Sequence, residues 1–462
     1  MDPHFPTLEP TNASRREFLR KSALLSVAGS ATPWALSLAA IGDAAAATAT
    51  DYKALVCVFL NGGNDYANTV VPYDTASYNL YQGFRPNIAL ARDTLLPLTP
   101  ATPLANGRQY ALAPRLSALA PLFGAGQLAV LMNIGTLVQP TTKAQYTARS
   151  VPLPPKLFSH NDQASYWQSS MAEGAVTGWG GRLGDLFASS NSTSTFTCIG
   201  LAGNAVFLSG NAALQYQVTS NGSIPVNGVS SALFGSTACS TALRNLMTGA
   251  RNHVLENELA RVADRSIDAN EMVTSALTSS NVATAFPANN TLADQLRLVA
   301  RLIGARNALG AKRQVFFVSL GGFDNHNALA TTHPNLLGNV GGAMAAFQQA
   351  MAELGVARQV TTFTASDFGR TLVSNSDGSD HGWGGFHFVM GGSVAGGTFI
   401  GTPPAVANNG ADDVGQGRLL PSLSVDQLAG TLASWFGASD TEVNDVVPNL
   451  SKFGTRTLPV FA

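Results

Sequence analysis

The sequence predicts an α/β fold whose mainly parallel sheet is flanked by helices. Residues 54–60 form a continuous apolar run, and residues 127–132, 314–320 and 360–364 look similar. Such runs are typical of strands that are covered on both faces, as in a parallel sheet. The last three follow helix candidates at 115–124, 291–309 and 335–354. This alternation of helix and buried strand indicates an α/β domain.

The remaining elements are predicted from local composition. Residues 189–236 are rich in Ser, Thr, Asn and Gly, which favours loops and small strands. Residues 241–280 resemble one or two amphipathic helices, so we expect a cap or insertion over residues 189–290. A last helix is predicted at 423–436, with Ser424 as its N-cap and Asp426 in its first turn.

The overall composition excludes several classes of protein. Of 462 residues, 45% are apolar and only 12% are charged, so disorder is not expected and the surface must be largely uncharged and polar. The formal net charge of −1 gives no field that would attract nucleic acid or an anionic membrane.

The N-terminus has the features of an export signal. Residues 14–21 read SRREFLRK, and a run of small apolar residues follows. We interpret residues 1–47 as a twin-arginine signal and residues 48–462 as the folded domain. A basic helix or a membrane anchor is the alternative, although Pro33 and Asp43 disfavour an anchor. The interpretation predicts contact with the twin-arginine translocase during export, a periplasmic or secreted product, and no stable membrane anchor after cleavage.

The cysteines suit such a destination without proving it. Cys57 lies in an apolar strand and is expected in the core, whereas Cys198 and Cys239 could pair in an oxidising compartment.

Acidic residues follow three of the predicted strands. Asp65 follows the first, Asp324 and His326 follow the run at 314–320, and Asp367 and Arg370 follow the run at 360–364. Because the carboxyl ends of parallel strands lie along one edge of a sheet, these side chains should meet there. Gathered carboxylates repel one another unless a proton or cation compensates them. Carboxylates and imidazoles together predict a site for a divalent cation, without distinguishing Zn, Ca, Mg and Mn.

Two further segments supply candidate residues. Residues 379–388 read SDHGWGGFHF, a glycine-rich stretch that delivers His381 to the same edge. His387 alternates with apolar neighbours and is either a second ligand or a core residue. Residues 159–163 read SHNDQ before a predicted helix, where Ser159 is a nucleophile or a plain N-cap and His160 a ligand or proton carrier.

Each candidate also has a purely structural interpretation. The three aspartates could be turn or cap residues at strand exits. Arg370 could pair with Asp367 or bind an anion. His333, before Pro334, is expected in a surface turn, and His253 on a helix face. A nucleotide site is disfavoured, because the GGNDYAN segment lacks a third glycine and a following lysine.

These segments together resemble a known family. Five segments are similar to the bacterial family called domain of unknown function 1501. They are the leader, LVCVFLNGGNDYANTVVPY, SHNDQ, FVSLGGFDNH and SDFGRTLVSNSDGSDHGWGGFHFVMGG. That family is grouped with the alkaline-phosphatase and sulfatase superfamily, so the resemblance implies an alkaline-phosphatase-like fold and metal-dependent hydrolysis.

The resemblance also implies roles for individual residues. It implies metal binding by Asp65, Asp324 and His326, and also by Asp367. The superfamily has a histidine directly after this last aspartate, where this chain has Phe368, and His381 would take its place. The superfamily nucleophile, at a helix start, would be Ser159 or Thr69.

The sequence thus predicts an exported hydrolase of a small phosphate or sulfate ester. Its metal ligands would be Asp65, Asp324, His326, Asp367 and His381, with Ser159, His160 and Arg370 in catalysis. A non-catalytic protein that binds a metal or an anion on the same fold is the alternative, and an assembly protein is a third.

Overall fold

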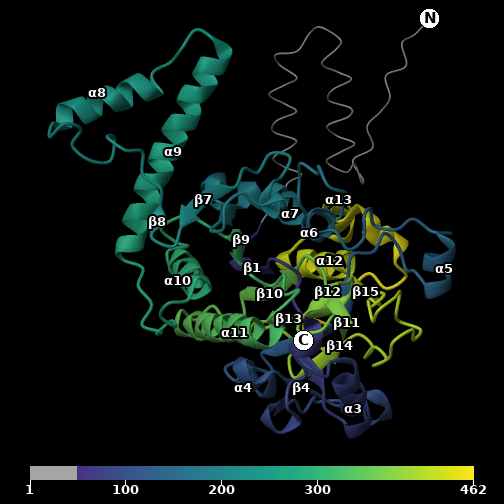
Figure 1. Ribbon diagram of the computed structural model, residues 1–462. Coiled ribbons are helices and arrows are strands. Elements are labelled where there is room, and N and C mark those ends of the chain that lie inside the picture. Colours follow the sequence, from purple (N-terminus) through teal and green to yellow (C-terminus); the bar gives the residue numbers. More distant parts are fainter. Residues whose placement is uncertain (1–48) are drawn as a thin grey trace, which may run out of the picture.

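A mixed sheet forms the centre of the molecule. The computed structural model describes residues 49–462, so the predicted signal at 1–47 lies outside the described residues. The strand order is β14-β5-β13-β10-β1-β9-β6-β7-β8, and β15 pairs with β5 (Figure 1). Pairing is parallel except at β10 with β13, β13 with β5 and β7 with β8. The ranges are β1 Lys53–Leu60, β5 Leu128–Gly135, β6 Cys198–Gly200, β7 Tyr216–Thr219, β8 Gly222–Ser223, β9 Arg313–Leu320, β10 Val360–Ser366, β13 Gly385–Met390, β14 Thr398–Ile400 and β15 Leu423–Ser424.

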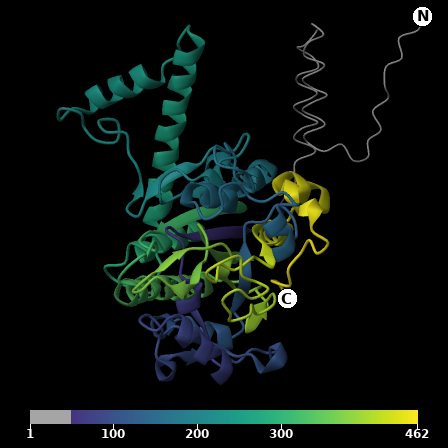
Figure 2. The ribbon, with the colours of Figure 1, turned by 45° about the vertical axis from the view of Figure 1, so that its right-hand side comes forward.

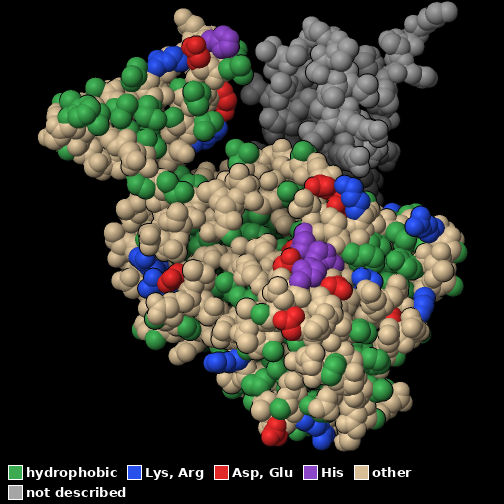
Figure 3. All heavy atoms as spheres, in the orientation of Figure 1, with side chains coloured by type: hydrophobic (Ala, Val, Ile, Leu, Met, Phe, Trp, Pro, Cys, Tyr) green, Lys and Arg blue, Asp and Glu red, His purple; other side chains and the backbone are tan. Residues whose placement is uncertain are grey.

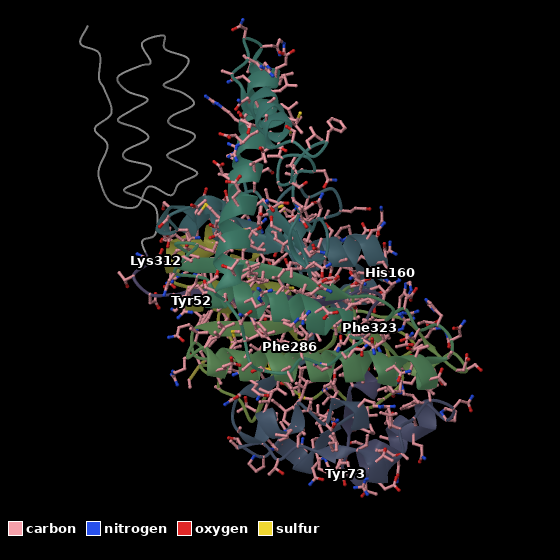
Figure 4. The ribbon with its side chains drawn as sticks, turned by 90° about the vertical axis from the view of Figure 1, so that its left-hand side faces the viewer. Tyr52, Tyr73, His160, Phe286, Lys312 and Phe323 are labelled. Carbon is pink, nitrogen blue, oxygen red and sulfur yellow. The ribbon has the colours of Figure 1, made fainter. Side chains whose placement is uncertain are left out.

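The three central strands end at the same level. Leu60 of β1 pairs with Leu320 of β9 and with Ser366 of β10, all in parallel register. In Figure 4 Tyr52 and Lys312, which precede β1 and β9, lie at one edge of the body, whereas Phe323 lies toward the other, on the side of His160. The predicted convergence of the strand exits therefore occurs.

Both faces of the sheet are covered. Alternate residues of β1 enter two separate cores, with Val56 and Val58 on one side and Cys57 and Phe59 on the other. This alternation explains why the whole run is apolar. The first core packs against α10 (Thr291–Gly304) and α11 (Leu329–Glu353), and the second against α7 (Trp179–Phe187), α12 (Val425–Phe436) and α13 (Asp440–Val446).

Smaller elements complete the body, and the predicted α/β class is confirmed. They are helices α3 Thr75–Phe84, α4 Ala120–Gly124, α5 Lys143–Ala148 and α6 His160–Ser169, the sheet of β2 Val70–Pro72, β3 Leu96–Pro97 and β4 Tyr110–Leu112, and the ribbon of β11 Arg370–Ser374 and β12 Ser379–His381.

Several local predictions are confirmed and one is wrong. Ser424 caps α12, with Asp426 in the first turn. His333 does not lie in a surface turn, because α11 runs through Pro334 and buries the ring, whose Nε2 lies 2.9 Å from Oδ1 of Asn64. The residue before a proline usually leaves the helical region, but here the helix continues.

Residues 189–290 contain both sheet edge and helices. Strands β6, β7 and β8 extend the main sheet, while α8 (Thr237–Thr248) and α9 (Val254–Thr278) project away from the body (Figures 1 and 2). The cysteines do not pair: Cys198 is buried, Cys239 is exposed on α8, and both are free. Within residues 49–462, no helix combines the length and the apolar character needed to cross a bilayer.

Candidate metal centre

Three imidazole rings meet at the carboxyl edge of the sheet. Nε2 of His381 lies 3.1 Å from Nε2 of His160 and 2.8 Å from Nε2 of His326. His160 is the first residue of α6, His326 follows β9, and His381 ends β12. The histidines form a patch on the surface, with acidic side chains around it (Figure 3). Segments far apart in sequence thus bring the same ring atom to one point.

The other nitrogen of each ring points outward to an oxygen. Nδ1 of His381 lies 2.8 Å from the carbonyl oxygen of Phe158, and Nδ1 of His160 lies 2.6 Å from Oδ2 of Asp367. Nδ1 of His326 is 3.3 Å from Oδ1 of Asp380. A carbonyl oxygen only accepts hydrogen bonds, so Nδ1 of His381 carries the proton and its Nε2, in a neutral ring, is a lone pair. Metal-binding histidines are held in this way, with the second N–H on a carboxylate or carbonyl.

Asp324 completes the cluster. Its Oδ1 lies 3.1 Å from Nε2 of His326 and 3.3 Å from Nε2 of His381, and its Oδ2 lies 3.5 Å from Nε2 of His160. Among the residues that the structure describes, His160, Asp324 and His381 offer ligand atoms that all lie within 4.8 Å of one another. One carboxylate oxygen pair therefore faces all three imidazoles.

The donor set fits a divalent cation. Neutral imidazole nitrogens at 2.8 to 3.1 Å repel one another through their lone pairs unless a proton or cation lies between them. Ligands at ~2.0–2.1 Å around a tetrahedral Zn²⁺ would stand roughly 3.3 Å apart, close to the observed separations. Three imidazoles with one carboxylate suit Zn²⁺ better than Ca²⁺ or Mg²⁺, which prefer oxygen.

The two rings beside Asp367 and Phe158 differ in proton affinity. The hydrogen bond to Asp367 raises the pKa of His160, whereas burial lowers the pKa of His381. Burial alone would raise the pKa of Asp324, but the hydrogen bond and charge of Arg370 outweigh it and lower that pKa. The cluster therefore keeps an ionised carboxylate beside a readily deprotonated ring, which favours cation binding.

Arg370 binds the Asp324 carboxylate of the cluster and does not face solvent, where an anion could reach it. Its Nη1 lies 2.8 Å from Oδ1 of Asp324 and 3.0 Å from the carbonyl oxygen of Gly62, while Nε and Nη2 donate to Ser379. The side chain is fully buried. The sequence offered a pair with Asp367 or an anion clamp, and the structure shows neither, because Asp324 takes the guanidinium.

Asp65 is the predicted ligand that the structure places elsewhere. The carboxylate is fully buried and forms a two-pronged ion pair with Arg85, at 2.9 and 2.6 Å. It also accepts hydrogen bonds from the backbone N–H of Asn68 and from Ser379. Burial would raise the pKa of Asp65, but the charge of Arg85 lowers it to about 2. Both oxygens are occupied, so Asp65 links the first strand exit to β12.

Asp367 stands behind the cluster instead of in it. Its Oδ2 accepts from Nδ1 of His160 and from the backbone N–H of Gly62, at 3.2 Å. Gly62 has a φ of +117°, and a Cβ there would lie 2.4 Å from the backbone nitrogen of Asp324, so a glycine is required. Phe368 packs its ring against His160 and His381, with centroids 4.8 and 4.7 Å away. The rings of His381 and His160 thus lie beside the position of Phe368.

Ser159 immediately precedes the cluster. It occupies the N-cap position of α6, but its side chain does not cap the helix. The hydroxyl instead donates to Oδ2 of Asp162 at 2.8 Å. Thr69 is buried and donates to the carbonyl oxygen of Asp65, which removes it from the edge.

His387 is a core residue. The ring is buried, Nδ1 lies 3.1 Å from the hydroxyl of Thr364, and Trp167 packs edge-on against it. Burial lowers the pKa of His387 to about 3.

Three supporting groups were missed in the sequence. They are Asp380, the carbonyl of Phe158, and Arg418, whose Nε donates to the carbonyl oxygen of His381 at 2.8 Å. The Arg418 guanidinium also lies 4.9 Å above the Phe158 ring. Asp380 adjoins His381 in the quoted stretch, so its position was a usable signal. Arg418 is remote in sequence, and no local pattern marks it.

The fold and this site define an α/β protein with a histidine and carboxylate cluster at the carboxyl edge of its sheet. The chain belongs to the family described as protein of unknown function (DUF1501), which matches residues 52–443. A search of curated proteins finds no match.

Similar solved structures have low sequence identity. One is Ps i-CgsB in complex with k-i-k-neocarrahexaose, with 10% identity, a TM-score of 0.36, and coverage of 87% of this chain and 77% of that chain. Ps i-CgsB alone has 11% identity and a TM-score of 0.35, with coverage of 87% of this chain and 77% of that chain. A third structure is described under the metabolism of multiple glycosaminoglycans by Bacteroides thetaiotaomicron. It has 12% identity and a TM-score of 0.33, with coverage of 87% of this chain and 74% of that chain.

Proposed function

We propose that the protein is an exported metal-dependent hydrolase of a phosphate or sulfate ester. The observation that carries the proposal is the meeting of three Nε2 atoms and the Asp324 carboxylate, with each Nδ1 directed outward to an oxygen. A bound divalent cation would polarise the ester oxygen and neutralise charge that develops on it. Zn²⁺ is the cation that this donor set favours.

The protein residues around the cluster have separable roles. His160, His326, His381 and Asp324 would hold the cation. Asp367 fixes the tautomer of His160, and Arg370 keeps Asp324 ionised and in place. These two are positioning residues, since their contacts are with ligands.

Ser159 is the proposed nucleophile. Its hydroxyl donates to the Asp162 carboxylate, which is the contact that a general base makes with an attacking hydroxyl. In the attack, the Ser159 oxygen bonds to phosphorus or sulfur, its proton passes to Asp162, and the alkoxide leaves with the electrons of the broken ester bond and takes a proton from solvent. Water then attacks phosphorus or sulfur, one of its protons goes to the Ser159 oxygen as that bond breaks, and phosphate or sulfate is released while Asp162 returns its proton to solvent.

The solvent exposure of the cluster suits a small substrate. His326 and Asp324 have side chains that are 43% and 46% exposed, so an ester oxygen can reach the site from one side. The ester oxygen would have to join four protein ligands, since catalytic zinc sites can expand to five ligands.

The test combines metal analysis with turnover. The purified protein should bind one equivalent of Zn²⁺ and hydrolyse an aryl phosphate or aryl sulfate, and His381→Ala should lose both properties. His253→Ala is the matched control, because His253 is an exposed histidine at the start of α9. A protein that binds no divalent cation contradicts the metal site, and one that binds it but leaves both esters intact contradicts the hydrolase.

A further inference from the structure

The helices α8 and α9 carry half of the exposed large hydrophobic side chains among the described residues. They project from the body as an arm, which here means residues 237–278 (Figures 1 and 2). Of twelve such side chains among the described residues, six lie outside the arm, at Leu80, Met171, Val176, Leu214, Ile224 and Phe234. A surface of this kind on an extended element marks an interaction site. The six on the arm are Leu246, Val254, Leu255, Leu259, Val262 and Met272.

One stripe of this surface runs along α9. Leu255, Leu259 and Val262 are 74%, 69% and 44% exposed. Their spacing of four and then three residues places them on the same side of the helix. We call these three residues the α9 stripe.

The same side of α9 is covered where the helix reaches the body. Ala269 and Ala276 follow Val262 at seven-residue intervals and are buried, and Val273 is fully buried in the main core. An apolar pattern with heptad spacing thus runs along the helix, interrupted at the exposed Ser266, and it is covered where the helix reaches the body. The α9 stripe is exposed, although α8 contacts α9 and Ala260 is buried.

The charges beside the stripe indicate what covers it. Glu258 and Arg265 lie along one flank of the α9 stripe, 3.1 Å apart, and each is about half exposed. In an antiparallel pair of identical helices, Glu258 of each copy faces Arg265 of the other, so the flank is complementary to itself. An anionic membrane fits less well, since α9 has five acidic residues and two arginines.

We propose that the arm binds a second copy of this chain. Two α9 helices pack antiparallel about a twofold axis, with Leu259 of one copy against Val262 of the other. Pairs between Glu258 and Arg265 form at both ends of the contact. The interface lies away from the metal centre, so dimer formation does not depend on the proposed hydrolysis.

The oligomeric state tests the proposal. Sedimentation equilibrium of the purified protein should show a dimer whose dissociation constant rises about tenfold or more in Leu259→Glu, because an apolar contact is replaced by a charge. Leu80→Glu, which changes an exposed leucine on α3, should leave the constant unchanged. Circular dichroism checks that each variant is folded.

Exchanging the charges of Glu258 and Arg265 distinguishes this specific contact from nonspecific hydrophobic association. Glu258→Arg alone should weaken the dimer, and the double variant Glu258→Arg with Arg265→Glu should restore it, because the reciprocal pairs return with reversed sign. A protein that stays monomeric at every concentration overturns the proposal. So does a dimer that is indifferent to Leu259→Glu.

Discussion

Nδ1 of His160 lies 2.6 Å from Oδ2 of Asp367, although 207 positions separate the two residues in the chain. The contact joins the first residue of α6 to the exit of β10. It leaves Nε2 of His160 free to face His381 and Asp324. A carboxylate behind a ligand orients the ring and increases its basicity.

Asp367→Asn should weaken Zn²⁺ binding by about 10- to 100-fold, as is usual when an outer partner of a metal ligand is changed. The amide keeps an acceptor oxygen but removes the negative charge, so the fold should be retained. Competition with a chromophoric chelator measures the affinity, and Asp93→Asn, an exposed aspartate outside the site, is the control. Equal affinities for wild type and Asp367→Asn would show that Asp367 does not act on the cluster.

Arg418 connects the two segments that deliver His160 and His381. It donates to the carbonyl oxygen of His381 and stacks on Phe158, whose own carbonyl accepts from Nδ1 of His381. Arg418→Lys should weaken Zn²⁺ binding about tenfold, because an ammonium cannot both stack and donate in this geometry. Arg115→Gln, at an exposed arginine, is the control. If only thermal stability falls and the metal affinity holds, Arg418 has a purely structural role.

Ser159→Ala should reduce hydrolysis by at least about 100-fold while Zn²⁺ binding stays as in wild type, because the change removes the attacking oxygen and no ligand. Asp162→Asn should likewise reduce turnover while the affinity for Zn²⁺ stays as in wild type. Aryl phosphate and sulfate assays under single-turnover conditions measure the chemical step. Full activity in Ser159→Ala would mean that another nucleophile attacks, and the serine would be only a helix-start residue.

The sequence predicted the sheet well because a strand that is buried on both faces is apolar at consecutive positions. The run at 54–60 is apolar throughout since alternate side chains enter two cores, and its carboxyl end therefore lies beside those of β9 and β10. The convergence of Asp324, His326, Asp367 and His381 follows from this topology. Helix ends were predicted less well, as at His333, where tertiary packing carries α11 through a proline.

The assignment of ligands could not be read from the sequence. Asp65 stands at a strand exit just as Asp367 does, but Arg85, twenty positions later, folds back onto it. Whether a carboxylate faces a cavity or a guanidinium depends on side-chain packing between remote segments. The same holds for Arg370, whose partner is Asp324, from another strand exit. Spacing alone has no information about such pairs.

Asp426 makes stability depend on pH in an identifiable way. The side chain is fully buried in the first turn of α12, one of its oxygens lacks a hydrogen-bond partner among the described residues, and burial raises its pKa to about 7. The unfolded chain has the ordinary value of 3.8, so the native state binds the proton more tightly. This contribution to stability is complete below about pH 4 and disappears as the pH rises through about 7.

Asp426→Asn removes that titration and keeps the size of the side chain. Between pH 5 and pH 8, wild type should lose up to about 2.6 kcal/mol of unfolding free energy relative to the variant, since about two of the pKa units separating the unfolded and native states lie in this range and each corresponds to about 1.4 kcal/mol. Urea unfolding at a series of pH values, with a chelator present throughout, measures this difference, and titrations common to both proteins cancel. Parallel pH profiles for wild type and Asp426→Asn would show that Asp426 ionises in the native protein as it does in the unfolded chain. The buried carboxyl predicts that the stability of the variant relative to wild type increases from about pH 4 to about pH 7 and is constant above that.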